Sequence, residues 1–197
     1  LLVLSAEGVP DRDLMALLHH GARNGTRILG PDTPGLIAPG RCKVGVHPDR
    51  MFAPGRVGVL SKSGALSYEV GKALTEADIG QSTVVGIGGG PLWGTTQEEV
   101  LRMFEDDPET DVVVLLGEVG GTMEYDAASV IEAYVSKPVV ALIVGRAAPR
   151  GAQMGHAGAI VEGNRGTAAS KIEALEAAGA HIAHSPSEIP EIIKRLE

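Results

Sequence analysis

Short apolar runs alternate along this chain with longer amphipathic stretches. Seven of the runs have the length and aliphatic content of buried strands, and they span residues 1–5, 27–29, 57–60, 83–86, 111–117, 138–144 and 181–183. Between most of them, apolar residues recur at helical spacing after a Ser, Thr, Asp or Pro. Helices are therefore predicted over residues 11–22, 65–77, 96–104, 124–134, 167–178 and 187–196.

The order of these elements indicates the fold class. Strands and helices in alternation predict a parallel sheet with helices on both faces, which is an α/β fold. Residues 56–197 hold five predicted strands and five predicted helices, enough for a complete flavodoxin-like domain. Residues 1–39 hold one strand–helix–strand unit, which we expect to be the end of a second α/β domain whose beginning is missing. Residues 40–55 are rich in proline and glycine and are predicted to be a linker.

The composition narrows the class of protein further. The 197 residues are 44% hydrophobic but only 3% aromatic, which favours closely packed aliphatic layers. A net charge of −8 without a lysine or arginine cluster argues against a nucleic-acid groove or an anionic membrane surface. The single cysteine, Cys42, excludes an internal disulfide and fits a cytoplasmic protein. No apolar run has the length of a membrane span or a signal peptide.

Glycine-rich segments follow several of the predicted strands, at the edge of a parallel sheet where ligands bind. The sequence S-K-S-G at residues 61–64 offers hydroxyls and N–H groups at the positive end of a helix dipole, which favours phosphate. Ser63 could equally be an ordinary helix N-cap. A second glycine-rich segment, residues 154–160, would let charged oxygens approach the backbone. The phosphate-binding candidates are Ser61, Ser63, Gly64, Ala65, Gly155 and Gly158.

One histidine and one glutamate are the candidate catalytic residues. His156 lies among residues too small to cover it, so its ring could act as nucleophile, base or metal ligand. Glu118 ends a strongly apolar strand among glycines and could accept the N–H of a histidine, which raises the nucleophilicity of the ring. The alternative is a glycine turn with a surface histidine and a solvated loop glutamate. The two side chains can meet only if the strands that precede them are neighbours.

The sequence lacks the common nucleotide-binding motifs. Residues 86–91 read G-I-G-G-G-P, which departs from the dinucleotide fingerprint because proline stands at the third glycine position. Residues 166–171 read G-T-A-A-S-K and lack the G-K-[ST] ending of a Walker A loop. Any nucleotide must therefore be held in another way.

Five motifs, in one order along the chain, resemble the α subunits of the succinyl-CoA synthetase family, which are NDP-forming acyl-CoA ligases. They are G-P-D-T-P-G at 30–35, S-K-S-G at 61–64, G-I-G-G at 86–89, G-E-V-G-G at 117–121 and G-H-A-G-A-I at 155–160. The resemblance covers essentially the whole chain. It implies that residues 1–39 are the end of a Rossmann-type CoA-binding domain and that residues 56–197 are the ligase domain.

The resemblance also implies a reaction. His156 would carry a phosphoryl group between an acyl phosphate and a nucleoside diphosphate, Glu118 would hold its other nitrogen, and coenzyme A would capture the acyl group. ATP or GTP with Mg²⁺ would bind on a separate β subunit with an ATP-grasp domain, with no metal site in this chain. Coenzyme A would rest mostly on residues before Leu1. Residues near the acyl group and coenzyme A would be Asp32, Thr33, Gly88 and Gly89.

Three positions depart from the family pattern, and two other functions stay open. Asp32, Gly90 and Trp93 stand where the family usually has Asn, Asp and Pro, and a carboxylate at Asp32 should repel a dicarboxylate such as succinate. Malate–CoA ligases and the ligase portion of ATP-citrate lyase share much of the motif pattern. The alternative from a different class is a non-catalytic or regulatory binding module with the same fold. An α/β domain whose glycine loops only turn corners fits the ordered motifs least well.

Overall fold

The computed structural model describes residues 1–146, 156 and 166–196. Its strands are β1 (Leu2–Val3), β2 (Ile28–Leu29), β3 (Gly35–Ala38), β4 (Cys42–Gly45), β5 (Pro54–Ser61), β6 (Gln81–Gly86), β7 (Val112–Glu118), β8 (Val139–Val144) and β9 (His181–Ala183). Its α-helices are α1 (Asp11–Arg23), α2 (Gly64–Glu76), α3 (Gln97–Asp106), α4 (Met123–Tyr134), α5 (Ala168–Ala177) and α6 (Glu188–Lys194). A short 3₁₀ helix spans Asp49–Met51.

The larger sheet has seven strands in the order β4-β3-β6-β5-β7-β8-β9. The five strands from β5 onward are parallel, and their order puts the second strand outside the first, as in flavodoxin-like folds. Each strand and helix predicted from the hydrophobic pattern is present within a few residues of its expected bounds. The predicted flavodoxin-like α/β class is confirmed.

The predicted linker is wrong in one respect, because part of that segment forms sheet. Strand β4 pairs with β3, and β3 pairs antiparallel with β6, so the hairpin extends the large sheet at its edge. Gly35 and Gly45 face each other at φ values of +90° and +119°, and a Cβ on Gly35 would lie 1.9 Å from the Val44 carbonyl oxygen. Two glycines therefore make the close approach of these strands possible.

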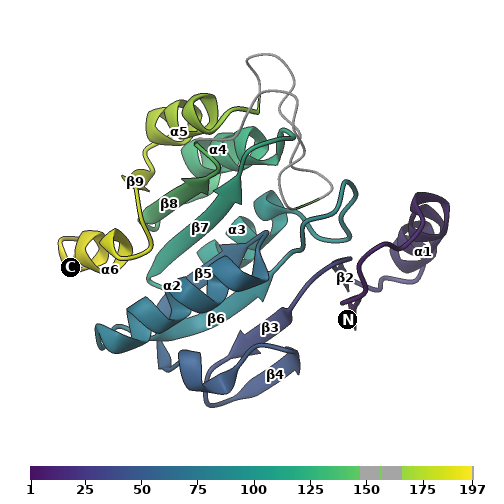
Figure 1. Ribbon diagram of the computed structural model, residues 1–197, viewed down its shortest axis with the longest axis horizontal. Helices are drawn as coiled ribbons and strands as arrows, with labels where there is room; N and C mark the ends of the chain where they lie inside the picture. Colours follow the sequence, from purple (N-terminus) through teal and green to yellow (C-terminus); the bar gives the residue numbers. More distant parts are fainter. Residues whose placement is uncertain (147–155, 157–165, 197) are drawn as a thin grey trace.

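The two faces of the sheet carry separate cores. On β7, Val112, Val114 and Leu116 point to the face covered by α2 and α6, while Val113 and Leu115 point to the face covered by α3, α4 and α5 (Figure 1). This alternation follows from the side-chain period of two along a strand. Because both faces are buried, the strand reads as a continuous apolar run.

The N-terminal segment lies to one side of the large sheet (Figure 1), where β1 and β2 form a small parallel sheet next to α1. It is tied to the loop after β6 by two hydrogen bonds. Gly94 N–H donates to the Gly30 carbonyl at 2.9 Å, and Thr95 Oγ1 donates to the Ile28 carbonyl at 2.6 Å. These bonds fix the end of β2 beside the carboxyl ends of the main strands. Across the described residues, no helix is long and apolar enough for a membrane span.

Candidate active site

The candidate site lies where the sheet changes the direction of its connections. In the strand order, the chain passes from β5 to β6 in one direction and from β7 to β8 in the opposite direction. The loops after the adjacent strands β5 and β7 therefore diverge, and ligands commonly bind in the crevice at such a switch point. The loop after β5 carries Ser63, and the end of β7 carries Glu118. The loop after β6 closes against them, because Ile87 N–H donates to the Ser61 carbonyl at 2.8 Å.

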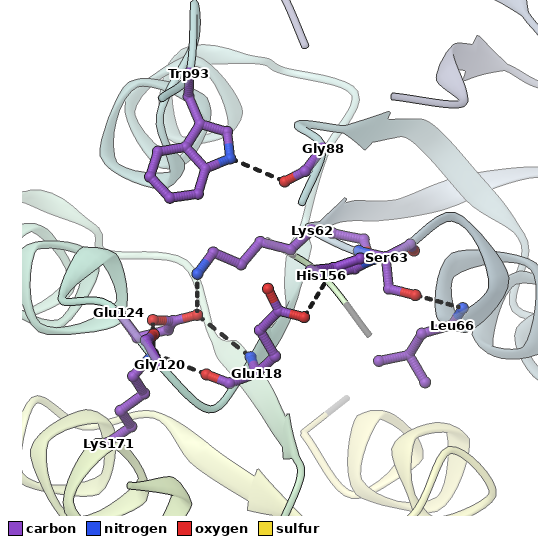
Figure 2. Close-up of polar contacts among 11 residues, drawn as sticks. Lys62, Ser63, Leu66, Gly88, Trp93, Glu118, Gly120, Glu124, His156 and Lys171 are labelled. Atoms are coloured by element: carbon purple, nitrogen blue, oxygen red, sulfur yellow. Dashed lines mark hydrogen bonds and ion pairs between the residues drawn. The ribbon is translucent and has the colours of Figure 1, made fainter. Parts of the chain in front are cut away.

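His156 and Glu118 meet in this crevice (Figure 2). The Nδ1 atom of His156 lies 2.6 Å from Glu118 Oε2, and the side chains are 25% and 9% exposed. Hydrogen bonding to Glu118 raises the pKa of the His156 imidazole above its usual value, although burial and Lys62 oppose this. Because a carboxylate accepts only, Nδ1 carries the proton, and the lone pair of the neutral ring lies on Nε2. The predicted pairing of these two residues is present.

Gly89 and Asp32 contribute to the surroundings of the imidazole. A Cβ on Gly89 would lie 2.3 Å from Cγ of His156, so only glycine leaves room for the ring at this place. Asp32 has a left-handed backbone at φ +54°. Burial and the neighbouring charge of Glu7 raise the pKa of the Asp32 carboxyl, while His156 and the Gly89 N–H lower it. Asp32 is therefore a second acidic group close enough to influence the histidine.

The start of α2 offers N–H groups to an anion. The Ser63 hydroxyl caps the helix by accepting the Leu66 N–H at 3.3 Å. Ser61 Oγ accepts the Ser63 N–H at 3.0 Å, so Ser61 shapes the loop from a fully buried position. In the described part of the chain no acceptor takes the N–H groups of Gly64 or Ala65, which are the first in the helix. The capping and the anion-binding interpretations of this segment are compatible.

Three buried charged residues that the sequence did not single out lie behind the pair. Lys62, Glu124 and Lys171 are each no more than 2% exposed. The Lys62 ammonium is 3.1 Å from Glu124 Oε1, and the Lys171 ammonium pairs with Glu124 Oε2. Figure 2 shows Lys62 extending from the Ser63 side of the site to Glu124. The only sequence signal for this cluster was the lysine inside the S-K-S-G motif.

The remaining predicted residues take structural places or lie outside the described range. The Thr33 hydroxyl is buried, donates to the Gly86 carbonyl and accepts the Gly35 N–H at 2.8 Å, so it stabilises its own loop. The Gly88 carbonyl accepts the indole N–H of Trp93 at 2.9 Å (Figure 2). Gly155 and Gly158 lie outside the described residues.

Several groups of the described site are suited to an anion. These groups are the N–H groups at the start of α2, the buried ammonium of Lys62 and the imidazole of His156, which also lies near the carboxylates of Glu118 and Asp32. Within the described ranges, no three His, Cys, Asp or Glu side chains are grouped as metal ligands. The arrangement can hold a charged tetrahedral group next to a nitrogen nucleophile.

The histidine–glutamate pair and the start of α2 thus lie at the switch point of a flavodoxin-like sheet, where such folds commonly bind ligands. The chain belongs to the CoA-ligase family, whose profile matches residues 60–181. It is 52% identical, over 98% of its length, to the succinate–CoA ligase [ADP-forming] subunit alpha of Methanothermobacter thermautotrophicus, of which it covers 66%. It is 46% identical over its whole length to the subunit of the same name from Aquifex aeolicus, of which it covers 65%. The chain thus spans about two thirds of these curated relatives.

A solved structure shares the fold at lower identity. The ATP citrate lyase of Methanosaeta concilii in complex with (3S)-citryl-CoA superposes with a TM-score of 0.90 at 28% sequence identity. The match covers 98% of this chain and 33% of that protein. The same domain architecture therefore occurs inside a larger protein whose structure contains an acyl-CoA.

Proposed function

We propose that this chain is the histidine-bearing α subunit of an NDP-forming acyl-CoA ligase. The observation that carries the proposal is the 2.6 Å contact between His156 Nδ1 and Glu118 in a crevice that also presents helix N–H groups. A nucleophilic imidazole needs one nitrogen fixed as a donor so that the other keeps its lone pair. The motif order of the sequence and the family membership support the same role.

His156 Nε2 attacks the phosphorus of an acyl phosphate, so that a P–N bond forms and the P–O bond to the acyl group breaks. The carboxylic acid leaves as its carboxylate, and the phosphoryl group then passes from Nε2 to a nucleoside diphosphate. In the opposite direction the carboxylate receives the phosphoryl group from His156 and becomes an acyl phosphate. The thiol of coenzyme A then attacks the acyl carbon of this acyl phosphate, so that a thioester forms and phosphate leaves.

Two groups of this chain assist the transfer. The Glu118 carboxylate keeps the proton on Nδ1 and stabilises the positive charge that the ring gains as the P–N bond forms. The N–H groups of Gly64 and Ala65, at the positive end of the α2 dipole, receive the phosphoryl oxygens. The Glu118 carboxylate thus acts at Nδ1, whereas the two N–H groups act on the phosphoryl group that Nε2 carries.

The nucleotide and its Mg²⁺ are proposed to bind on a separate ATP-grasp β subunit. The described residues include no cluster of metal ligands, and the sequence carries no Walker A ending. The curated relatives are named as alpha subunits, which supports a partner chain. Residues 1–34 are proposed to belong to a CoA-binding Rossmann domain; the predicted boundary at residue 39 is too late, because β3 pairs with β6 in the large sheet.

The substrate is proposed to be succinate or a similar small carboxylic acid. The names of the relatives favour succinate, whereas the solved neighbour contains citryl-CoA. Asp32 next to His156 adds a negative charge that disfavours a second carboxylate on the substrate. A panel of mono- and dicarboxylic acids, assayed for acyl-CoA formation with the β subunit present, separates these acids.

The test of the proposed chemistry is transfer of label from γ-labelled ATP. The complete α subunit with its β subunit should acquire acid-labile, base-stable label, and His156→Asn should acquire none while keeping the wild-type unfolding midpoint. Label at wild-type stoichiometry in His156→Asn would overturn the assignment of the nucleophile. Failure of the wild-type complex to acquire label would favour the non-catalytic binding module.

A further inference from the structure

The buried ion cluster of Lys62, Glu124 and Lys171 has no role in the phosphoryl transfer as described so far. It comes from three different elements, since Lys62 follows β5, Glu124 lies in the first turn of α4 and Lys171 lies in α5. Each side chain is almost fully buried. Replacing such an ion pair with apolar residues is often neutral or stabilising, so buried charges of this kind are weak evidence for a purely structural role.

The cluster contacts the main chain of Glu118 on both sides. Glu124 Oε1 accepts the Glu118 N–H at 3.3 Å, and the Lys171 ammonium donates to the Glu118 carbonyl at 2.7 Å. The same ammonium donates to the Gly120 carbonyl. Glu124 also packs on Gly117, where a Cβ would lie 2.9 Å from its Cγ atom. The cluster thus contacts the chain at Gly117, Glu118 and Gly120, and the contacts to Glu118 and Gly120 can be followed in Figure 2.

We propose that Lys171 and Glu124 are positioning residues that aim the Glu118 carboxylate at His156 Nδ1. This inference rests on the proposed function of the Glu118–His156 pair and adds two residues to it. The Lys62 ammonium pairs with Glu124 Oε1, the same oxygen that accepts the Glu118 N–H. Glycines at 117, 120 and 121 flank Glu118 and supply no side chain that could anchor the strand end. The charged cluster provides the anchor that those glycines lack.

The positioning matters because the pair is short and directional. A displacement of about 1 Å lengthens a 2.6 Å contact beyond normal hydrogen-bond range and removes most of the influence of the carboxylate on the ring. Among the described residues, the charged groups that act on His156 include Glu118 from β7, Asp32 from the loop after β2 and Lys62 from the loop after β5. Lys171 is linked to the Glu118–His156 pair by its hydrogen bond to the Glu118 carbonyl.

The deciding variant is Lys171→Met, because the two possible effects of this change have opposite signs. Loss of a nearby positive charge alone would raise the pKa of His156. Loss of the hydrogen bond that holds the Glu118 main chain would lower the pKa of His156, and we expect a fall of about 0.5–1 pH unit. The measurement is the ¹⁵N–¹H NMR titration of the His156 ring in the 197-residue chain, with the resonance assigned from His156→Asn. A rise, or no change, would overturn the proposal.

Lys72→Met is the matched control, because Lys72 pairs with Glu76 at 3.5 Å on the exposed surface of α2. It should leave the titration of His156 unchanged. A shift equal to that of Lys171→Met would show that any lost lysine produces the effect, and this result would also overturn the proposal.

A second measurement keeps the proposal testable if Lys171→Met does not fold. Glu124→Gln should lower the pKa of His156 when Glu118 is present and should have much less effect in the Glu118→Gln background. An equal shift in both backgrounds would show that Glu124 acts on His156 directly and would contradict the positioning role. The titration needs neither nucleotide nor β subunit. Failure of the positioning role therefore leaves the labelling test of the proposed function unaffected, and the reverse also holds.

Discussion

Replacing Glu118 with glutamine removes the negative charge from the His156 pair and keeps its shape. The amide oxygen of Gln can occupy the place of Oε2 and still accept the Nδ1 proton. A hydrogen bond to a charged group contributes about 1.5–3 kcal/mol, and the neutral bond that replaces it contributes about 1 kcal/mol. With a His156 side chain that is 25% exposed, we expect a net loss of about 1–2 kcal/mol for the imidazolium state.

That loss can be read from the titration of His156 in the chain alone. Because one pKa unit corresponds to about 1.4 kcal/mol, the pKa of His156 should fall by roughly 1 unit in Glu118→Gln. The hydrogen bond to Glu118 raises the folded-state pKa above the unfolded value. Its contribution to stability is therefore complete below pH of about 6.5 and is lost as the pH rises through the folded-state pKa. The wild type should exceed the variant in free energy of unfolding at pH 5.5 by more than at pH 9.

The same variant should slow phosphoryl transfer in the complex by about two to three orders of magnitude, because the positive ring that forms in the transition state loses its counter-charge. Single-turnover labelling with the β subunit measures this rate. Glu76→Gln, at an exposed glutamate of α2, is the matched control and should behave like the wild type. An unchanged pKa of His156, or an unchanged single-turnover rate, would refute the reasoning about the pair.

Three further predictions concern the packing around the site. Gly89→Ala should abolish labelling of His156, because the added Cβ would lie 2.3 Å from Cγ of the ring. Urea unfolding of the same variant shows whether the loss of labelling is instead due to global unfolding. Ser63→Ala should reduce the free energy of unfolding by about 1 kcal/mol through loss of the α2 cap, whereas Ser63→Asn should keep it; equal losses would contradict the capping role. Leu115→Ala, at a fully buried β7 position, should cost about 2–5 kcal/mol in the same assay, and a cost below 1 kcal/mol would contradict its place in the core.

The sheet could be predicted well where the chain is buried on both faces. Strands β7 and β8 are continuous aliphatic runs, and length together with aliphatic content distinguishes them from helices. The β3–β4 hairpin could not be predicted as reliably. Every residue of β4 is exposed, and each of the two four-residue strands has a glycine at one end, so β4 lacks the burial that marks a strand. Its pairing with β6 depends on the fold of the rest of the sheet.

In the site, too, some residues can be predicted from their neighbours in sequence and others only from contacts between distant segments. His156 and Glu118 stand out in the sequence because each polar side chain lies among small residues that cannot hide it. Their meeting depends on β7 and β8 being neighbours, which only the structure shows. Lys171 and Glu124 stand out in no such way, since a lysine and a glutamate on amphipathic helices usually face water. Their burial arises from a pairing across 47 residues of sequence, which no local pattern encodes.

The charges around His156 act against one another. Glu118 and Asp32 raise the pKa of the ring and Lys62 lowers it. Glu118 alone would favour the imidazolium, which has no lone pair on Nε2 and cannot attack phosphorus. Lys62 opposes that protonation and stays buried beside the anion site, where its charge complements an incoming phosphoryl group. Lys62→Met should therefore raise the pKa of His156 through the lost charge and slow labelling at neutral pH, with less slowing at higher pH, where the ring is neutral in both proteins. Equal slowing at every pH would contradict this role.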